Sequence, residues 1–383
     1  MVPTPLQVKD TVVIEAPLLE QLLQTLTAQG YAVIGPTIRD GAIVVDRLNS
    51  AQELPIGWTD TQEPGAYRLK QREDRTYFGY SLGPQSWKRI LQPPVQKLWS
   101  AERSDKEFSI VPEQSSSPSL ALIGIRPCEL RAMEVQDKIF LSGDLVDSNY
   151  KSRRGAFLVV VNCSQAGGTC FCASMGSGPS ATSGFDLALT EIVNAEKHFF
   201  VVDVGSTRAA ELLLKVPHSR ATAAEKEAAH QVVAETARHM GRTLNTAGLK
   251  DLLYASYDHP RWDNVAARCL SCTNCTMVCP TCFCTTIKDA TDLTGKKAER
   301  WKEWDSCFTT EFSYIHGGSV RASVKSRYRQ WLIHKLATWI DQFDVLGCVG
   351  CGRCITWCPV GIDLTEEVRA IRGTDSSPRG ETT

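Results

Sequence analysis

Two runs of closely spaced cysteines in the last third of the chain are the residues best suited to chemistry. They are CLSCTNCTMVCP and CVGCGRCITWCP, and both fit the spacing C-x2-C-x2-C-x3-C-P. In bacterial two-cluster ferredoxins, three thiolates of such a run bind one [4Fe–4S] cluster and the fourth binds the other cluster. The spacing therefore predicts two clusters that exchange their fourth ligands. Cluster 1 is expected on Cys269, Cys272, Cys275 and Cys358, and cluster 2 on Cys348, Cys351, Cys354 and Cys279.

Zinc and a purely structural cluster are the alternatives. A zinc ribbon uses two C-x-x-C pairs separated by a spacer, so a third cysteine three residues further on has no place in its tetrahedral site. A structural cluster usually occurs alone, whereas a reciprocal pair of clusters favours a chain of redox centres. The runs therefore predict electron transfer, with no substrate bond made or broken by this chain.

A third set of cysteines lies in the middle of the chain. Cys128 follows the apolar run LALIGI, Cys163 follows AFLVVV, and Cys170 and Cys172 stand in the sequence CFC. Residues just past the ends of adjacent parallel strands converge at one sheet edge. The flanking glycines, which let the backbone approach a cluster closely, are Gly167, Gly168, Gly176 and Gly178. The four thiols are a possible third iron–sulfur site; zinc, a [2Fe–2S] centre and plain buried thiols are the alternatives.

Three further cysteines belong to none of these sets: Cys282 and Cys284 in PTCFC, and Cys307 in WDSC. The plain interpretation is that they line the dicluster domain. Alternatively, Cys282 or Cys284 replaces Cys279 as a ligand, or Asp305 and Cys307 tune the reduction potential from outside the ligand set.

The first two thirds of the chain show an α/β pattern. An amphipathic helix is predicted over 18–30, followed by strands at 31–34 and 42–45. A hairpin is expected over 64–80, with a helix after it at 85–91.

The middle of the chain predicts a parallel pair of strands. The continuous apolar runs at 120–125 and 156–161 are too short for helices, and a helical segment at 129–140 lies between them, as in a βαβ unit. A further strand is expected at 199–204 and a helix at 209–214. The segment 221–254 predicts two helices that break at Gly248.

The predicted fold class is an α/β N-terminal and middle region with a partly parallel sheet, plus an α-helical C-terminal domain that contains a split two-[4Fe–4S] ferredoxin core. The expected parts are an N-terminal region at 1–118, a middle domain with the possible third cluster at 119–217, a helical linker at 218–260, the dicluster domain at 261–372 and a disordered tail at 373–383.

The two ferredoxin runs are separated by residues 281–347, which include a basic helical stretch at 323–343. Its basic residues are expected to form a solvated face, or a face that docks a partner subunit. They are Lys325, Arg327, Arg329 and Lys335.

Composition excludes several classes of protein. Lys plus Arg (42) balance Asp plus Glu (43) in the 383 residues, so no charge footprint for nucleic acid or an anionic membrane exists. No apolar run approaches the roughly 20 residues of a membrane span, and no export signal is recognisable. The 15 clustered cysteines then favour metal binding in the cytoplasm over disulfides. No G-x-G-x-x-G motif stands at a strand-to-helix turn, so no flavin or nicotinamide is expected on this chain.

Several longer motifs carry a family resemblance. They are PGAYRL, FGYSLGPQSWKRIL, GIRPCELRAMEVQDKIF, CFCASMGSGP, CLSCTNCTMVCPTCFC, WDSC and CVGCGRCITWCPVGID. With them, the chain resembles over nearly its whole length the β subunit of soluble nickel–iron sulfhydrogenases, the cytoplasmic NAD(P)-linked hydrogenases. That family includes the A subunit of anaerobic sulfite reductase.

The resemblance implies a role inside a heterotetramer. Such a subunit conducts electrons, in either direction, between a flavin and NAD(P)H-binding γ subunit and the hydrogenase small and large subunits. The resemblance also suggests a redox role for the middle-domain cysteines. An alternative within the family is an electron-transfer subunit that supplies electrons to a sirohaem partner for sulfite reduction. An alternative of another class is a binding module with structural clusters.

Overall fold

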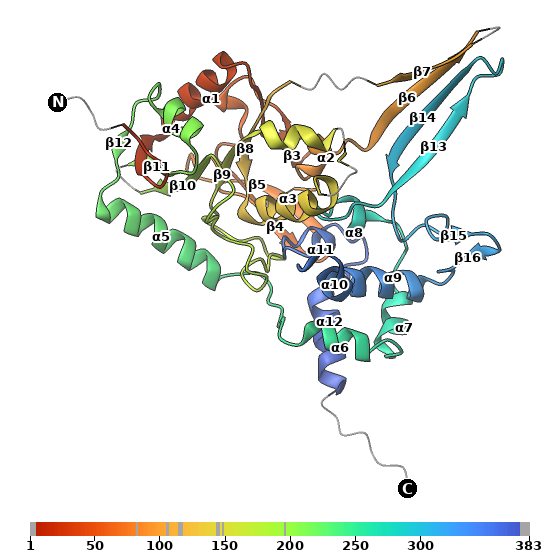
Figure 1. Ribbon diagram of the computed structural model, residues 1–383. Helices are drawn as coiled ribbons and strands as arrows, with labels where there is room; N and C mark the ends of the chain where they lie inside the picture. Colours follow the sequence, from red (N-terminus) through yellow and green to blue (C-terminus); the bar gives the residue numbers. More distant parts are fainter. Residues whose placement is uncertain are drawn as a thin grey trace.

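The computed structural model describes residues 5–81, 83–104, 107–113, 118–142, 146–147, 149–194 and 197–375. Its centre is an eight-stranded mixed sheet (Figure 1). The strands in spatial order are β12 (Ser219–Arg220), β1 (Thr11–Glu15), β11 (His198–Val204), β10 (Leu187–Val193), β9 (Phe157–Val161), β8 (Leu120–Ile125), β2 (Ala32–Arg39) and β3 (Ala42–Arg47).

The middle of this sheet is parallel and its flanks are antiparallel. Strand β8 pairs in parallel with β2 and β9, and β9 pairs in parallel with β10. Strands β3, β11, β1 and β12 complete the sheet in antiparallel ladders. The prediction of a partly parallel sheet, with helix α3 (Pro127–Phe140) between β8 and β9, is confirmed.

Helices cover both faces of the sheet because its strands are apolar on both sides. Along β9, Phe157, Val159 and Val161 join the core under α1 (Leu19–Ala28) and α4 (Thr207–Leu213). Leu158 and Val160 join the opposite core, under α3. Helix α5 (Ala223–Arg238) covers β10 and β11. Strands buried on both faces lack alternation, which is why 120–125 and 156–161 are continuous apolar runs.

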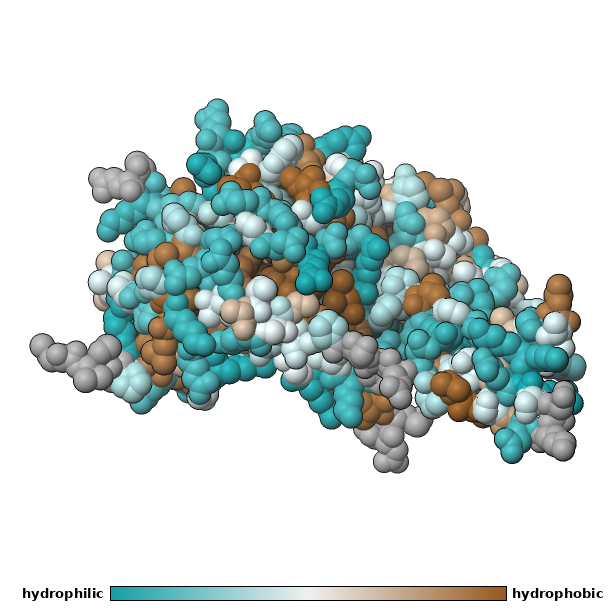
Figure 2. Space-filling view, turned by 90° about the horizontal axis from the view of Figure 1, so that it is seen from above, coloured by the Kyte–Doolittle hydropathy of each residue, from teal (hydrophilic) through white to brown (hydrophobic). Residues whose placement is uncertain are grey.

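A second sheet projects from the body as an arm (Figure 1). Its strands in order are β13 (Thr285–Thr291), β14 (Lys297–Trp304), β6 (Val95–Arg103) and β7 (Phe108–Pro112). The arm therefore joins two stretches of chain that are far apart in sequence. Apolar side chains are exposed on it, namely Val95, Phe108, Ile110, Val111, Ile287 and Leu293. Figure 2 shows hydrophobic residues dispersed among hydrophilic ones at that end of the molecule.

The C-terminal region packs helices around its own core. They are α6 (Leu249–Ala255), α7 (Arg261–Ala266), α8 (Asn274–Met277), α9 (Val324–Ile333), a π-helical turn (His334–Thr338), α10 (Trp339–Phe343), α11 (Arg353–Thr356) and α12 (Leu364–Asp375). Trp262, Trp331 and Leu332 are buried at its centre. The segment between the two ferredoxin runs is not only helical, because it also contains the β13–β14 hairpin and the short pair β15 (Tyr314–Ile315) and β16 (Gly318–Ser319).

The N-terminal hairpin lies earlier in the chain than its motif suggests. Its strands are β4 (Trp58–Glu63) and β5 (Ala66–Gln71), so PGAYRL holds the turn and the second strand. The motif YFGY is irregular, because the amides of Tyr77 and Phe78 donate to the carboxylate of Glu191 at 2.6 and 2.8 Å instead of to a neighbouring strand. The prediction of a hairpin over 64–80 was therefore wrong in its boundaries.

Other short elements complete the fold: α2 (Lys88–Leu91) and the 3-10 turns at Ala16–Leu18, Ala51–Glu53 and Tyr150–Gly155. Helix α12 continues to Asp375, into the expected tail, and residues 376–383 lie outside the described part of the chain. Within the described residues, no helix combines the length and the apolar character needed to cross a membrane.

A buried ion pair joins the second ferredoxin run to the α/β body. Arg353 Nη2 lies 2.6 Å from Glu129 Oε1, and both side chains are almost fully buried. The guanidinium also donates to the carbonyls of Gly83 and Gln85, and the carboxylate accepts from Trp87 Nε1. Three parts of the chain thus meet at one pair of charges.

Glu129→Ala should destabilise the protein by about 3–5 kcal/mol, because it leaves the Arg353 charge buried without its partner. Urea unfolding of the intact chain measures this change. Asp289→Ala, which breaks the exposed Arg300–Asp289 pair on the arm, is the control and should unfold like the parent. An unchanged midpoint for Glu129→Ala would contradict the role given to this pair.

Candidate iron-sulfur centres

The two cysteine runs fold in the same way. In the first, Ser271 and Thr273 have positive φ values of 50° and 70°; in the second, Gly350 and Gly352 at the equivalent positions have 64° and 76°. A short helix then begins at the equivalent residue of each run, α8 in the first and α11 in the second. These left-handed residues turn the backbone so that three cysteines face one point.

Backbone amides donate to cysteine sulfur at matching places. The amide of Ser271 lies 3.4 Å from Cys269 Sγ, and the amide of Gly350 lies 3.4 Å from Cys348 Sγ. N–H donors aimed at sulfur stabilise negative charge there and set the reduction potential of a cluster. Both runs therefore have the local geometry that a ligated cluster requires.

The four thiols assigned to cluster 1 line one apolar cavity. Burial raises the pKa of Cys269 and, more strongly, of Cys275. Both thiols are therefore protonated unless a metal is bound. The residues around the cavity include Cys269, Cys272, Cys275, Cys358, Leu270, Phe308, Tyr328, Trp331 and Ile362.

The thiols assigned to cluster 2 also lie together. Burial raises the pKa of Cys348 to about 12 and also raises that of Cys354, and the neighbouring Cys279 adds to both shifts. The pKa of Cys279 itself is well below its ordinary value, because Cys282 donates to its sulfur and a buried ammonium, Lys335, lies beside it. Both neighbours thus favour the thiolate form of Cys279.

Lys335 is not part of a solvated basic face. Its Nζ donates to Cys279 Sγ at 3.1 Å, to Thr281 Oγ1 at 3.0 Å and to the carbonyl of Gly347 at 3.2 Å, and only 4% of the residue is exposed. Arg327 is buried as well. The prediction of a solvated stretch was therefore wrong for these two residues, because the helix turns them inward, and Lys335 faces the thiols.

The two runs have different surroundings. An added Cβ at Gly350 would lie 2.7 Å from the backbone of Phe171, and one at Gly352 would lie 2.4 Å from Thr169 Oγ1. The second run therefore needs glycine where the first tolerates serine and threonine. The first run faces outward instead, and Cys272 and Leu270 are exposed.

The middle-domain cysteines come together where the sequence places them, beyond the carboxyl ends of β8 and β9. Cys128 lies in the first turn of α3 and packs in one buried group with Cys172 and Cys351. Burial raises the pKa of Cys170 to about 12, and the neighbouring Cys163 thiol adds to the rise. Four thiols thus surround one buried place next to the second run.

Glycines approach these sulfurs as expected at two positions. A Cβ on Gly178 would lie 2.9 Å from Cys172 Sγ, and one on Gly167 would lie 3.3 Å from Cys170 Sγ. In contrast, the position of a Cβ on Gly176 is open. The binding of a third cluster here stays a prediction.

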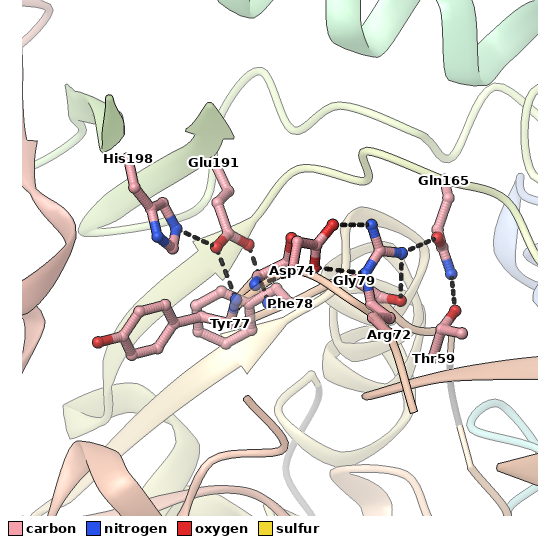
Figure 3. Close-up of polar contacts among 10 residues, drawn as sticks. Thr59, Arg72, Asp74, Tyr77, Phe78, Gly79, Gln165, Glu191 and His198 are labelled. Atoms are coloured by element: carbon pink, nitrogen blue, oxygen red, sulfur yellow. Dashed lines mark hydrogen bonds and ion pairs between the residues drawn. The ribbon is translucent and has the colours of Figure 1, made fainter. Parts of the chain in front are cut away.

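A polar network fixes the loop after Cys163 (Figure 3). Arg72 pairs with Asp74 at 2.6 Å and donates to Gln165 Oε1 at 3.0 Å, and Gln165 in turn donates to Thr59. His198 lies 2.7 Å from the Glu191 carboxylate that holds the amides of residues 77 and 78.

The segment 77–80, whose first two amides are held by Glu191, in turn accepts hydrogen bonds from a buried arginine beside Cys163. Arg126 donates to the carbonyls of Phe78 and Tyr80 at 2.8 and 2.7 Å. Burial raises the pKa of the Cys163 thiol, and the Arg126 charge opposes the rise. A fixed cation thus lies next to one thiol of the middle set.

The donor sets suit cubanes better than single ions. Among the described residues, no group of three or more histidine, cysteine, aspartate or glutamate side chains is arranged to hold a metal ion. A cubane makes a different demand, because each of its four cysteines binds a different iron. Four thiols around an apolar cavity, with amides aimed at their sulfurs, meet that demand.

The three unassigned cysteines lie close to the thiols assigned to cluster 2. Cys282 is hydrogen-bonded to Cys279, and Cys284 to Cys307. The carboxylate of Asp305 instead accepts from the amide of Ser306 and the hydroxyl of Thr309, which closes a turn.

Sequence reasoning missed the buried cations around the thiols. These are Lys88, Arg126, Lys335 and Arg353. A signal existed for Lys335, which is the one lysine in the otherwise largely apolar stretch WLIHKLATWI. Arg126, by contrast, lies next to a proline at a strand end, where a surface charge is equally compatible with the pattern.

Comparison with known proteins fits this geometry. The family described as the 4Fe-4S dicluster domain matches residues 268–362, so the C-terminal part of the chain is a domain of the iron–sulfur dicluster class. Most of the chain is similar to sulfhydrogenase 2 subunit beta of Pyrococcus furiosus. The two are 26% identical over 343 residues, which cover 89% of this chain and 92% of the relative.

Lys335→Met should lower the midpoint potential of the cluster next to Cys279 by about 60 mV, equivalent to a tenfold change for one electron. A buried positive charge stabilises the more negative, reduced state, and methionine removes that charge. A redox titration followed by EPR measures the shift, and Lys335→Arg should restore most of it. Lys325→Met, in the preceding helix α9 and paired with Asp263, should leave the potential unchanged. An equal shift there would contradict the assignment.

Proposed function

We propose that this chain is an iron–sulfur electron-transfer subunit of a nickel–iron hydrogenase complex. In this role it relays electrons between a flavin and NAD(P)H-binding subunit and the hydrogenase small and large subunits. The observation that supports it most is the pair of cysteine loops with equivalent backbone turns and equivalent amide–sulfur contacts. The name of the Pyrococcus relative, a sulfhydrogenase beta subunit, supports the hydrogenase partner.

The chain's own residues hold, insulate and bias the redox centres. We assign Cys269, Cys272, Cys275 and Cys358 to cluster 1, and Cys348, Cys351, Cys354 and Cys279 to cluster 2. A [4Fe–4S] cluster supplies reversible one-electron transfer when bound. Tyr328, Trp331 and Ile362 keep the first site apolar. Lys335 and the sulfur-directed amides favour added negative charge, whereas acid–base or nucleophilic groups are not needed for this role.

The contacts between the sets support one order for the proposed relay. Cys170 Sγ lies 3.8 Å from the carbonyl oxygen of Cys351, so the middle set adjoins the second run. Cys275 of the first run lies close enough to raise the pKa of Cys354, after burial and the thiols of its own set. Electrons would therefore pass between the middle domain, cluster 2 and cluster 1, and exchange with a partner near the exposed Cys272.

Two surfaces suit partner subunits. One is the outward side of the first run, where Leu270 is 63% exposed beside Cys272. The other is the arm, whose edge strand β7 exposes Phe108 and Ile110. Flavin and nicotinamide chemistry belongs to a partner, and we place the complex in the cytoplasm.

Cys351→Ala tests the relay in the assembled complex. The variant should lose cluster 2 and with it most of the hydrogen-dependent reduction of NADP, while hydrogenase activity with a dye that bypasses this subunit is retained. Gas chromatography and NADPH absorbance measure the two rates. Unchanged NADP reduction in a variant that lacks the cluster 2 EPR signal would contradict the proposal.

The double variant Cys170→Ser, Cys172→Ser tests the third site. The isolated parent chain should contain at least about 12 iron atoms if three cubanes are bound, and the variant about 4 fewer. Iron and acid-labile sulfide analysis gives both numbers, and the spin-coupled EPR signals of the two ferredoxin clusters should persist. An equal iron content in parent and variant would show that these cysteines are buried thiols that bind no cluster.

A further inference from the structure

The three cysteines outside the assigned sets are brought together by the arm. Cys284 directly precedes β13, and Cys307 follows β14 by three residues. Because Thr285 is the register partner of Trp304, the base of the hairpin places the two segments side by side. The amide of Asp305 donates to the carbonyl of Cys284 at 2.9 Å, which closes the base.

The thiols at this base face one another. Cys284 and Cys307 share a hydrogen bond, which lowers the pKa of Cys284 to about 7 and raises that of Cys307. Cys282 lies two residues before Cys284 and leans against Cys279. The ring of Phe283 between them packs edge-on against Trp339 at 5.6 Å, which fixes the CFC segment.

Two buried lysines, Lys88 and Lys335, lie beside the thiols at the base of the hairpin. Lys88 is 7% exposed, and its Nζ lies 3.2 Å from the carbonyl of Cys282 and 3.8 Å from the centre of the Trp304 ring. Burial lowers the pKa of Lys88, whereas the neighbouring Cys282 and Cys279 raise it and so favour its charged form. In the described part of the chain, no carboxylate pairs with either lysine within 4 Å.

Buried cations without anionic partners are costly, and two of them side by side repel. Neutral buried thiols would not offset this cost. Cys279, as a ligand of cluster 2, offsets one charge at most, and Cys282 and Cys284 are the groups beside Lys88 that can supply a second negative charge. The thiols of Cys282 and Cys284 adjoin both ammonium groups, and that of Cys307 adjoins Lys335. Thiolates bound to iron and sulfide carry net negative charge.

We propose that Cys282, Cys284 and Cys307 bind a further iron–sulfur cluster at the base of the β13–β14 hairpin, with Lys88 and Lys335 as its counter-charges. With three thiolates, it is a [3Fe–4S] cluster or a [4Fe–4S] cluster with one iron held by a group other than cysteine. The inference rests on the proposed function in one respect, namely that Cys279 stays with cluster 2.

The test compares the iron and acid-labile sulfide contents of the parent chain with those of a double variant, both produced and purified without oxygen. Cys284→Ser, Cys307→Ser should contain about 3 to 4 iron atoms fewer than the parent, and the EPR signals of the ferredoxin pair should persist. Mössbauer spectra of the lost component distinguish the two cluster types. Cys351→Ser is the matched control, because it should instead remove the spin coupling of the ferredoxin pair.

Lys88→Met keeps the inference testable if the double variant does not fold. This variant should lower the midpoint potential of the cluster proposed at Cys282, Cys284 and Cys307. The midpoint potentials of the two ferredoxin clusters should stay nearly unchanged. Iron equal to that of the parent in the double variant overturns the proposal, and so does a Cys284–Cys307 disulfide found by mass spectrometry after mild oxidation with no loss of iron. In both cases the ferredoxin signals remain, so the proposed function stands; a parent without those signals would instead refute the function.

Discussion

The buried pair between Arg353 and Glu129 is the contact on which the arrangement of the redox centres depends. Arg353 lies between two cysteines of the second run, and Glu129 lies next to Cys128 of the middle set. Neither charge can be hydrated where it lies, so each holds the other in one geometry. The α/β body and the dicluster domain are thereby fixed as a unit, and the second run is held against the middle-domain thiols without a mobile linker between them.

The near-identity of the two cysteine loops contrasts with what surrounds them. Equal backbone turns and equal amide–sulfur contacts would give two clusters similar potentials. The second set, however, is enclosed by protein and has a cation at Cys279, whereas the first opens towards solvent at Cys272. Net charge and solvent exposure are two factors that give chemically identical clusters different reduction potentials. One duplicated motif can therefore provide two distinct steps in a relay.

Much of the functional site could be predicted from the sequence because its signals are local. The ligand runs depend on fixed spacings, and the βαβ unit around α3 depends on two apolar runs that no other element explains. The inward side chain of Lys335 could not be predicted, since a lysine in a basic helix is normally solvated. The arm was missed because TTIKDAT and KAERWKEW are polar on both faces and lack an alternating pattern. Its strand pairing also joins residues about 200 positions apart.

That long-range pairing has a consequence for biogenesis. Strand β14 is bounded on one side by β13 and on the other by β6, which is made much earlier during synthesis. A fragment beginning at the first cysteine run would leave one edge of β14 unpaired and prone to associate with other chains. The ferredoxin-like part is therefore not an autonomous module that could be excised and moved between proteins. The ligand set proposed for cluster 1 is complete only after Cys358 has been synthesised, long after Cys269.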